Sequence, residues 1–279
     1  MVELFKIGNF TIYLFGVMIA IGMIVGICLM QIEAKRKNLN SDQMFELALY
    51  TLIVSVIGAR IYYILVFNLQ EYIKNPIEVF SLRDGGLSIQ GGMITGVLFA
   101  LWYAKRKNIA FWKAADAFAP AIVAGQAIGR IGCDVFGIPM KTIYPWGVVV
   151  NSQVLHPAQM YEMILDLILF SYLWSRRGKI KYNGQLFIEY VIGFSINRAI
   201  VEFFRTNPVV IKPLTVAHIT SIVLIIAALI VRNFVKDKQM MPEVEIKNNT
   251  VKTYIYEYVL VVLVGIIGLL IYYNVHQAF

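Results

Sequence analysis

Long apolar runs alternate with short polar segments along the whole chain. Each run is close to the roughly 20 residues that a helix needs to cross a bilayer. Eight runs recur, at about 10–31, 46–66, 86–104, 111–132, 156–175, 184–204, 214–233 and 253–274. A segment inside hydrocarbon must satisfy its own backbone hydrogen bonds, so each run is expected to be an α-helix. The pattern therefore predicts an all-α, polytopic membrane helical bundle.

The composition supports lipid as the solvent. Of the 279 residues, 59% are hydrophobic and 15% are charged, whereas a soluble domain carries roughly 25% charged residues. The net charge of +8 comes from Lys and Arg in short loops, which favours anionic lipid headgroups over nucleic acid as partners. Two isolated cysteines and three histidines suggest neither a metal cage nor a disulfide scaffold. We expect no metal and no cofactor.

The distribution of basic residues predicts the orientation. If the N-terminus lies outside, sixteen Lys and Arg residues fall in the inside segments and six in the outside ones. Basic residues concentrate in cytoplasmic loops, so both termini are expected outside if all eight runs cross. The first run is too long for a typical cleavable signal, and its basic cluster follows it.

The last apolar run stands apart from the others. A polar, charged connector separates it from the preceding run. We expect residues 1–235 to form a seven-helix membrane domain, residues 236–252 a cytoplasmic linker, and residues 253–279 an additional C-terminal transmembrane helix.

Several charged residues lie inside or at the ends of the apolar runs, where a charge is costly and usually functional. Arg60, Arg130, His156 and Arg205 all fall toward the outer leaflet in the predicted orientation, and Arg198 and Glu202 share one helix face. Guanidinium groups near one headgroup plane suit a phosphate, because arginine binds it through two parallel hydrogen bonds. The alternative is that they form snorkelling or structural ion pairs. Other polar side chains in the fourth and fifth runs are Asp116, Gln126, Gln159, Tyr161, Glu162 and Asp166.

A glycine-rich stretch from Asp84 to Gly92 opens the third run, and it contains Gln90, Gly91 and Gly92. Paired glycines allow a backbone to approach a ligand or another helix closely. A tight turn followed by helix packing explains the stretch equally well.

Five segments together resemble the prolipoprotein diacylglyceryl transferase family, in its order and spacing, over about residues 5–235. They are Gly58-Ala59-Arg60, the stretch Asp84 to Gly92, Gly129-Arg130-Ile131-Gly132, His156-Pro157-Ala158-Gln159-Met160-Tyr161-Glu162, and Arg198-Ala199-Ile200-Val201-Glu202-Phe203-Phe204-Arg205. The resemblance implies a seven-helix fold in the bacterial cell membrane. It also implies transfer of diacylglyceryl from phosphatidylglycerol to the lipobox cysteine thiol of prolipoprotein signal peptides, with release of glycerol phosphate.

Site residues follow from the resemblance and from the charges already described. We expect Arg130 and Arg205 to bind the lipid phosphate, with Arg60 or Arg198 in support. The base that activates the thiol is His156, or Glu202 acting through Arg198. The expected catalytic set is Arg130, His156, Arg198, Glu202 and Arg205. The expected lipid-binding set is Arg60, Gln90, Gly91, Gly92, Arg130, Gln159 and Tyr161.

The chain departs from the family pattern at several positions. Cys133, Asp134 and Ile138 stand where the family signature has Asn, Phe and Glu, and Gln90 stands where a His or Tyr is common. Phe15 replaces the Tyr of a usual Tyr-Gly pair. Two alternatives therefore stay open. One is a divergent paralogue that uses another acceptor, and the other is a non-catalytic protein that binds or transports anionic lipids.

Overall fold

A computed structural model describes residues 2–8, 10–67, 69–80, 85–207, 209–211, 214–241 and 254–276. The chain divides into two compact units, one formed by Ala34–Ala114 and the other by Met1–Glu33 with Ala115–Phe279. Asp84 of the glycine-rich stretch, residues 242–252 of the predicted linker, and residues 253 and 277–279 of the last predicted segment lie outside the described residues.

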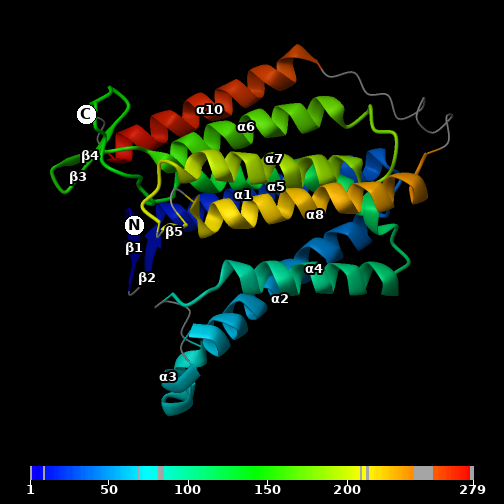
Figure 1. Ribbon diagram of the computed structural model, residues 1–279, viewed down its shortest axis with the longest axis horizontal. Helices are drawn as coiled ribbons and strands as arrows, with labels where there is room; N and C mark the ends of the chain where they lie inside the picture. The colour runs from blue at the N-terminus through cyan, green and yellow to red at the C-terminus, as the bar shows by residue number, and fades with distance from the viewer. Residues whose placement is uncertain are drawn as a thin grey trace. The chain divides into compact units, whose positions relative to one another are not determined.

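Each of the eight apolar runs forms a helix within the described ranges, which confirms the helical prediction (Figure 1). These helices are α1 (Leu14–Arg36), α2 (Ser41–Phe67), α4 (Ile89–Arg106), α5 (Phe111–Ile131), α6 (Ala158–Arg176), α7 (Gln185–Glu202), α8 (Val216–Lys238) and α10 (Ile255–His276). In the described part of the chain, four of them, α1, α2, α8 and α10, are long and apolar enough to cross a membrane. The protein is thus a polytopic helical membrane protein.

Short strands outside the long helices correct the expectation of an all-α chain. The strands are β1 (Glu3–Ile7), β2 (Phe10–Tyr13), β3 (Val148–Val150), β4 (Gln153–Leu155), β5 (Val209–Ile211) and β6 (Leu214–Thr215). Within the described ranges, these strands pair in sequence order as three antiparallel hairpins. Segments outside the hydrocarbon can pair with a neighbouring strand, because they need not satisfy every backbone group within one helix.

In the smaller unit, α2 and α4 pack antiparallel through small residues. A Cβ added to Gly91 would lie 2.3 Å from the Tyr62 Cβ atom, and one added to Gly58 would overlap the Thr95 side chain. Such close approach between helix backbones is possible only with small residues. The short helix α3 (Leu69–Lys74) and the 3₁₀ helix η1 (Pro76–Phe80) complete this unit.

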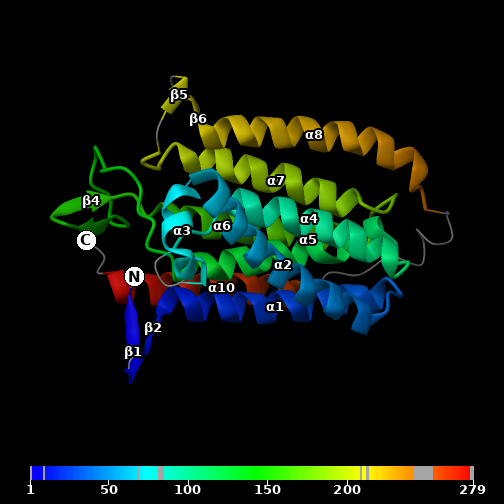
Figure 2. The same cartoon turned by 90° about the horizontal axis from the view of Figure 1, so that it is seen from below.

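In the larger unit, α1 and α5 also meet through glycine. A Cβ on Gly22 would lie 2.7 Å from the Gly125 carbonyl oxygen, so the two backbones touch directly. The helices α6, α7, α8 and α10 continue the bundle, with α6 beside α7, α7 beside α8, and α10 beside α6. The β1–β2 hairpin leads directly into α1 (Figure 2).

The buried core of the larger unit has two parts. One surrounds the second half of α6, where Leu173 and Trp174 pack with Leu186 of α7. The other surrounds the first half of α6, where Met160 and Met163 pack with Tyr272 of α10. The candidate site lies beside the second of these core parts, where α5 ends and α6 begins.

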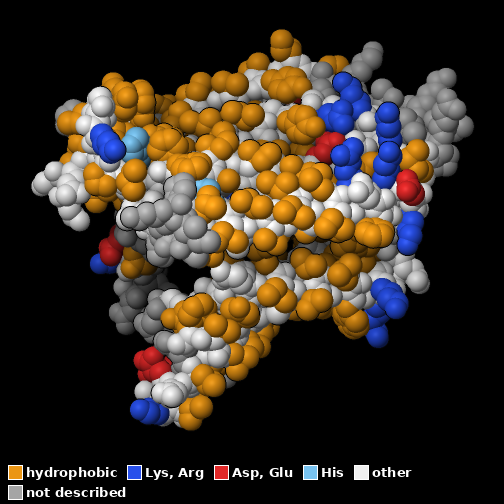
Figure 3. Space-filling view, in the orientation of Figure 1, with side chains coloured by type: hydrophobic (Ala, Val, Ile, Leu, Met, Phe, Trp, Pro, Cys, Tyr) orange, Lys and Arg blue, Asp and Glu red, His pale blue; other side chains and the backbone are white. Residues whose placement is uncertain are grey.

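The outer surface of the larger unit fits a lipid environment. Apolar side chains such as Ile222, Ile226 and Ile230 of α8 are about half exposed, and hydrophobic groups cover the flanks of these helices (Figure 3). Lys and Arg gather at the end where α6 and α8 finish, around Arg176 and Lys236 (Figure 3). An apolar belt with a basic end is the surface expected of a membrane bundle.

Asp116, one of the polar residues singled out in the fourth run, has a structural role. Its side-chain oxygens accept the backbone N–H groups of Gly184 at 2.9 Å and Phe187 at 3.0 Å, at the start of α7. Gly184 has a φ of +95°, a conformation that L side chains rarely adopt. The buried carboxylate thus satisfies N–H groups that a helix N-terminus leaves unpaired.

Candidate active site

Arg130 sits one residue before the end of α5 and forms a close ion pair with α6. Its Nη2 atom lies 2.6 Å from Oε1 of Glu162. The Glu162 side chain is 1% exposed, whereas that of Arg130 is 28% exposed. Nη1 of Arg130 also lies 3.9 Å from the Cys133 Sγ atom. The carboxylate is therefore buried behind the guanidinium, which keeps an accessible edge.

The glycines that flank Arg130 pack against α1. A Cβ on Gly132 would lie 2.8 Å from the carbonyl oxygen of Leu14, and one on Gly129 would lie 4.0 Å from the Ile19 side chain. The end of α5 consequently lies close to the start of α1. The close contact gives Gly132 a packing role, whereas Gly129 has room for a Cβ.

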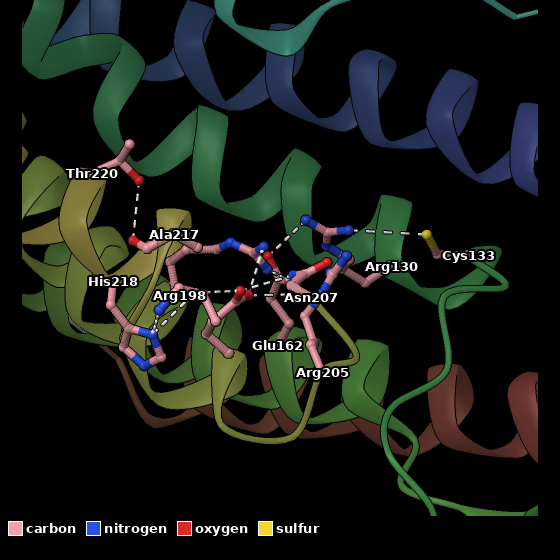
Figure 4. Close-up of polar contacts among 11 residues, drawn as sticks. Arg130, Cys133, Glu162, Arg198, Arg205, Asn207, Ala217, His218 and Thr220 are labelled. Carbon is pink, nitrogen blue, oxygen red and sulfur yellow. Dashed lines mark hydrogen bonds and ion pairs between the residues drawn. The ribbon is translucent and has the colours of Figure 1, made fainter. Parts of the chain in front are cut away.

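A chain of alternating charges extends from Arg130 along α6 and α7 (Figure 4). Arg198 reaches Glu162 at 3.8 Å and Glu202 at 3.0 Å, and the Nε atom of Arg205 lies 3.9 Å from Glu202. We call Arg130, Glu162, Arg198, Glu202 and Arg205 the arginine–glutamate network. With both carboxylates ionised, three guanidinium groups leave one net positive charge.

The network presents its positive groups outward. Both glutamate side chains are almost fully buried, while Arg198 is 22% and Arg205 is 17% exposed. Burial, and after it the neighbouring charge of Arg198, lowers the pKa of Arg205 from its usual value. A site where positive charges crowd one another stabilises an incoming anion, because the anion relieves that repulsion.

Glu202 is held by further residues that the sequence did not single out. Its Oε1 atom accepts hydrogen bonds from Asn207 at 2.8 Å and from the Thr215 hydroxyl at 2.7 Å. The Nδ1 atom of His218 lies 3.1 Å from the same hydroxyl, at the start of α8. The other oxygen of Glu202, Oε2, pairs with Arg198 and Arg205, so both carboxylate oxygens are engaged. A Thr followed three residues later by a polar side chain before an apolar run resembles a capping box, and this signal could have marked the helix start in the sequence.

His156 lies just before α6 in an aromatic setting. Its Nδ1 atom is 3.0 Å from the Tyr161 hydroxyl, which also accepts the indole N–H of Trp146 at 3.0 Å. The Phe204 ring lies 5.2 Å from both the His156 and Tyr161 rings. Burial lowers the pKa of His156, so the imidazole is neutral at neutral pH and able to accept a proton.

The segment around Gly137 ties His156 to the end of α7. The Gly137 N–H donates to the His156 carbonyl at 2.8 Å, and the Ile138 N–H donates to the Phe204 carbonyl at 2.9 Å. A Cβ on Gly137 would overlap the Phe204 carbonyl oxygen. This close crossing places the backbones next to His156 and Arg205 side by side, and only glycine fits there.

Gln159 and Arg60, both expected to contact lipid, make structural contacts. The Gln159 amide donates to the Tyr272 hydroxyl at 2.6 Å. In the smaller unit, Arg60 donates to backbone carbonyls of Glu78 and Val79 and of Gly85 and Gly86, at 2.7 to 3.1 Å. Its guanidinium thus holds the chain between α3 and α4.

The glycine-rich stretch also belongs to the smaller unit. Ser88 caps α4 by accepting the Gly91 N–H, and its hydroxyl donates to Oε1 of Gln90 at 2.9 Å. A Cβ on Gly92 would lie 3.2 Å from the Ser55 carbonyl oxygen of α2. Of the two explanations from sequence, helix packing is therefore visible for Gly91 and Gly92.

Comparison with known proteins identifies a consistent set of relatives. Residues 2–234 match the family model described as prolipoprotein diacylglyceryl transferase. A phosphatidylglycerol–prolipoprotein diacylglyceryl transferase of Clostridioides difficile is 36% identical over 236 residues, which cover 84% of this chain and 95% of the relative. An enzyme of the same name from Nostoc is 36% identical over 239 residues, covering 78% and 83%. Another from Halalkalibacterium halodurans is 35% identical over 241 residues, covering 81% and 83%.

Proposed function

Since the chain belongs to the prolipoprotein diacylglyceryl transferase family and is a transferase, we propose that its arginine–glutamate network binds the phosphate of phosphatidylglycerol during the reaction. The diacylglyceryl group moves to the thiol of a lipobox cysteine in a prolipoprotein signal peptide. The products are a thioether-linked lipoprotein precursor and glycerol phosphate.

The reaction is a displacement at carbon. The cysteine thiolate attacks the C3 carbon of the diacylglycerol unit, which is bonded to a phosphate ester oxygen. A C–S bond forms, the C–O bond breaks, and its electron pair leaves on the phosphate of glycerol phosphate. The thiol proton goes to a base. The leaving group gains negative charge as the bond breaks, so fixed positive groups around it lower the barrier.

One observation carries this assignment: in the network, three partly exposed arginines surround two buried glutamates. The phosphodiester of phosphatidylglycerol carries one negative charge, and its departing phosphate gains a second. Arg130 has the most exposed side chain of the three, at 28%. We assign it the bidentate contact to phosphate, with Arg205 as the second ligand and Arg198 bridging the two glutamates.

His156 is the better candidate for the base. Its pKa is lowered by burial, so the imidazole is neutral at neutral pH. Tyr161 contacts Nδ1, and Nε2 is the ring nitrogen that we assign to the thiol proton. Glu202 acting through Arg198 is the other candidate, but its oxygens already accept from Asn207 and Thr215 and pair with arginine. The pH dependence of transfer by His156 and Glu202 variants separates these two candidates.

Topology and domain organisation complete the proposal. The N-terminus lies outside, and the end of the bundle with His156 and Arg130 faces the outer leaflet, where phosphatidylglycerol enters. The basic end around Arg176 and Lys236 faces the cytoplasm. Residues 1–235 form the seven-helix transferase domain, residues 236–252 form a cytoplasmic linker, and α10 is an additional transmembrane helix.

The departures at Gln90, Cys133 and Ile138 keep one alternative open, which is transfer to a different acceptor. Membership in a family of enzymes argues against the reading as a non-catalytic lipid-binding or transport protein. Expression in a bacterial strain depleted of its own diacylglyceryl transferase tests whether the acceptor is a lipobox cysteine or a different group. Rescue of growth and of lipoprotein modification supports the proposal. Stable membrane expression without rescue favours another acceptor.

A further inference from the structure

The last turn of α10 contacts the segment between α5 and α6, which also carries His156. We infer that α10 is a positioning element: Tyr272, Tyr273 and His276 hold the residues around Arg130 and His156 in their working arrangement. The inference rests on the proposed function of those residues. It concerns a helix that begins at Ile255, beyond the matched range of 2–234.

Tyr272 fixes the start of α6. Its side chain is completely buried, and its hydroxyl accepts the Gln159 amide at 2.6 Å. One turn earlier, Gly268 packs closely against the residues that follow Arg130 and Glu162 in the chain. A Cβ added to it would lie 2.9 Å from Ile131 and 3.0 Å from Met163. Both of these residues directly follow a member of the Arg130–Glu162 ion pair, so α10 packs against the side chains next to it.

Tyr273 connects α10 to His156 through three contacts. Its hydroxyl donates to the Trp146 carbonyl at 2.8 Å. The Trp146 indole N–H then donates to the Tyr161 hydroxyl, which lies 3.0 Å from Nδ1 of His156. Trp146 is 46% exposed and lies in an external loop. The Trp146 ring also stacks on Tyr144 at 4.7 Å, and Tyr273 adds a contact that fixes the Trp146 backbone.

His276 contacts the loop after α5. Its Nε2 atom lies 3.1 Å from Oδ1 of Asp134, and its ring packs edge-on against Tyr272 at 4.6 Å. Asp134 follows Cys133, whose sulfur lies within reach of Arg130. The side chains of Tyr272, Tyr273 and His276 thus contact the segments on either side of the site, and the end of α10 lies beside β3 (Figure 1).

A helix that served only as a lipid anchor would not need these contacts. The middle of α10 has the surface of an anchor, since Leu260, Val262 and Ile266 are about half exposed or more. Among the described residues, the polar contacts of α10 with the segment between α5 and α6 come from Tyr273 and His276. Side chains that fix the orientation of catalytic groups raise the rate by holding a productive geometry, and a displacement of about 1 Å can cost up to a hundredfold.

The test uses the full-length protein in micelles that contain phosphatidylglycerol, with a lipobox peptide as acceptor. The variants are Tyr272→Phe and Tyr273→Phe, each of which removes one hydroxyl. The control is Tyr256→Phe, on the first turn of the same helix, where the side chain is 64% exposed. We expect each of the two test variants to lower kcat/KM roughly tenfold. The control should match the wild type, and all should unfold within a few degrees of it.

A pH profile separates positioning from general destabilisation. Loosening Trp146 admits water to His156, so its pKa should return toward the ordinary value, and the acid limb of kcat/KM in Tyr273→Phe should move to higher pH. Trp146→Phe should shift the limb in the same direction, and the double variant should lose less than the sum of the two single losses.

Wild-type kcat/KM and an unshifted acid limb in Tyr272→Phe and Tyr273→Phe would overturn the inference. A loss of folded protein with normal turnover per folded molecule would also overturn it, because α10 would then only stabilise the fold. A wild-type protein that transfers nothing would instead contradict the proposed function itself.

Discussion

Arg130 and Glu162 meet at 2.6 Å across α5 and α6, with the carboxylate buried and the guanidinium partly exposed. The position of each residue within its own helix does not by itself bring the two side chains together. The pair exists because the end of α5 and the first turns of α6 pack side by side. It sets both the orientation of the arginine and the net charge of the arginine–glutamate network.

Glu162→Gln tests the role of the buried carboxylate. The change removes a buried negative charge and leaves Arg130 and Arg198 without their shared partner. We expect a loss of roughly 1–3 kcal/mol in unfolding free energy, together with a large loss of transfer activity. Thermal unfolding in detergent measures the first effect. Glu3→Gln is the control, since Glu3 forms an exposed pair with Lys6 and should cause no measurable change. Equal unfolding free energies of Glu162→Gln and wild type would show that the pair does not stabilise the fold.

The pH dependence of transfer identifies the base. Burial lowers the pKa of His156 below the ordinary histidine value of 6.5. The imidazole is neutral above that lowered pKa and protonated below it, so activity should be constant near neutral pH and fall only below about pH 6.5. His156→Gln should lower kcat by roughly a hundredfold or more and remove this limb. An unchanged acid limb in His156→Gln, with its loss in Glu202→Gln, would transfer the role to Glu202.

Cys133 is expected to be dispensable. The thiol is 7% exposed and contacts the Arg130 guanidinium at 3.9 Å, which makes a covalent lipid intermediate on its sulfur conceivable. Small buried cysteines usually serve packing. Cys133→Ser should therefore keep turnover within about threefold of wild type. A variant that folds normally but transfers nothing would point to a covalent intermediate.

Thiol labelling tests the orientation in intact cells. A cysteine introduced at Asn75, which follows α3, should react with an impermeant reagent from outside. A cysteine at Asn38, in the turn after α1, should react only after the membrane is permeabilised. The native protein with its own cysteines, Cys28 and Cys133, provides the background. The opposite labelling pattern would invert the proposed topology and move the site to the inner leaflet.

The helices were predictable because hydrocarbon leaves the backbone no other choice, and the apolar runs alone mark them. The first and last residues of the helices were less predictable. The first run was expected from residue 10, yet residues Phe10–Tyr13 form a strand and α1 starts at Leu14. Pairing with the preceding strand Glu3–Ile7 decided this, and such pairing depends on a partner rather than on local apolarity.

The identities of the charged residues were predictable, but their partners were not. A charge within an apolar run is visible in the sequence, so Arg130, Arg198 and Glu202 stood out. Which of them meet depends on how α5, α6 and α7 pack, as the pairing of Arg130 with Glu162 shows. For the same reason Gln159, expected to bind lipid, is hydrogen-bonded to Tyr272. That residue lies 113 positions away in the sequence.

The most direct test of the account is transfer of labelled diacylglycerol from phosphatidylglycerol to a lipobox peptide by Arg130 variants. Arg130→Ala should lower kcat roughly a hundredfold or more while lipid affinity changes less, because the group acts mainly on developing charge. Arg130→Lys should recover only part of the activity, since lysine lacks the second parallel hydrogen bond. Arg176→Ala, which removes an ion pair with Glu189 at the basic end, serves as the control and should stay near wild type. Near-normal transfer by Arg130→Ala, at normal membrane levels, would contradict the assignment of this network as the phosphate site.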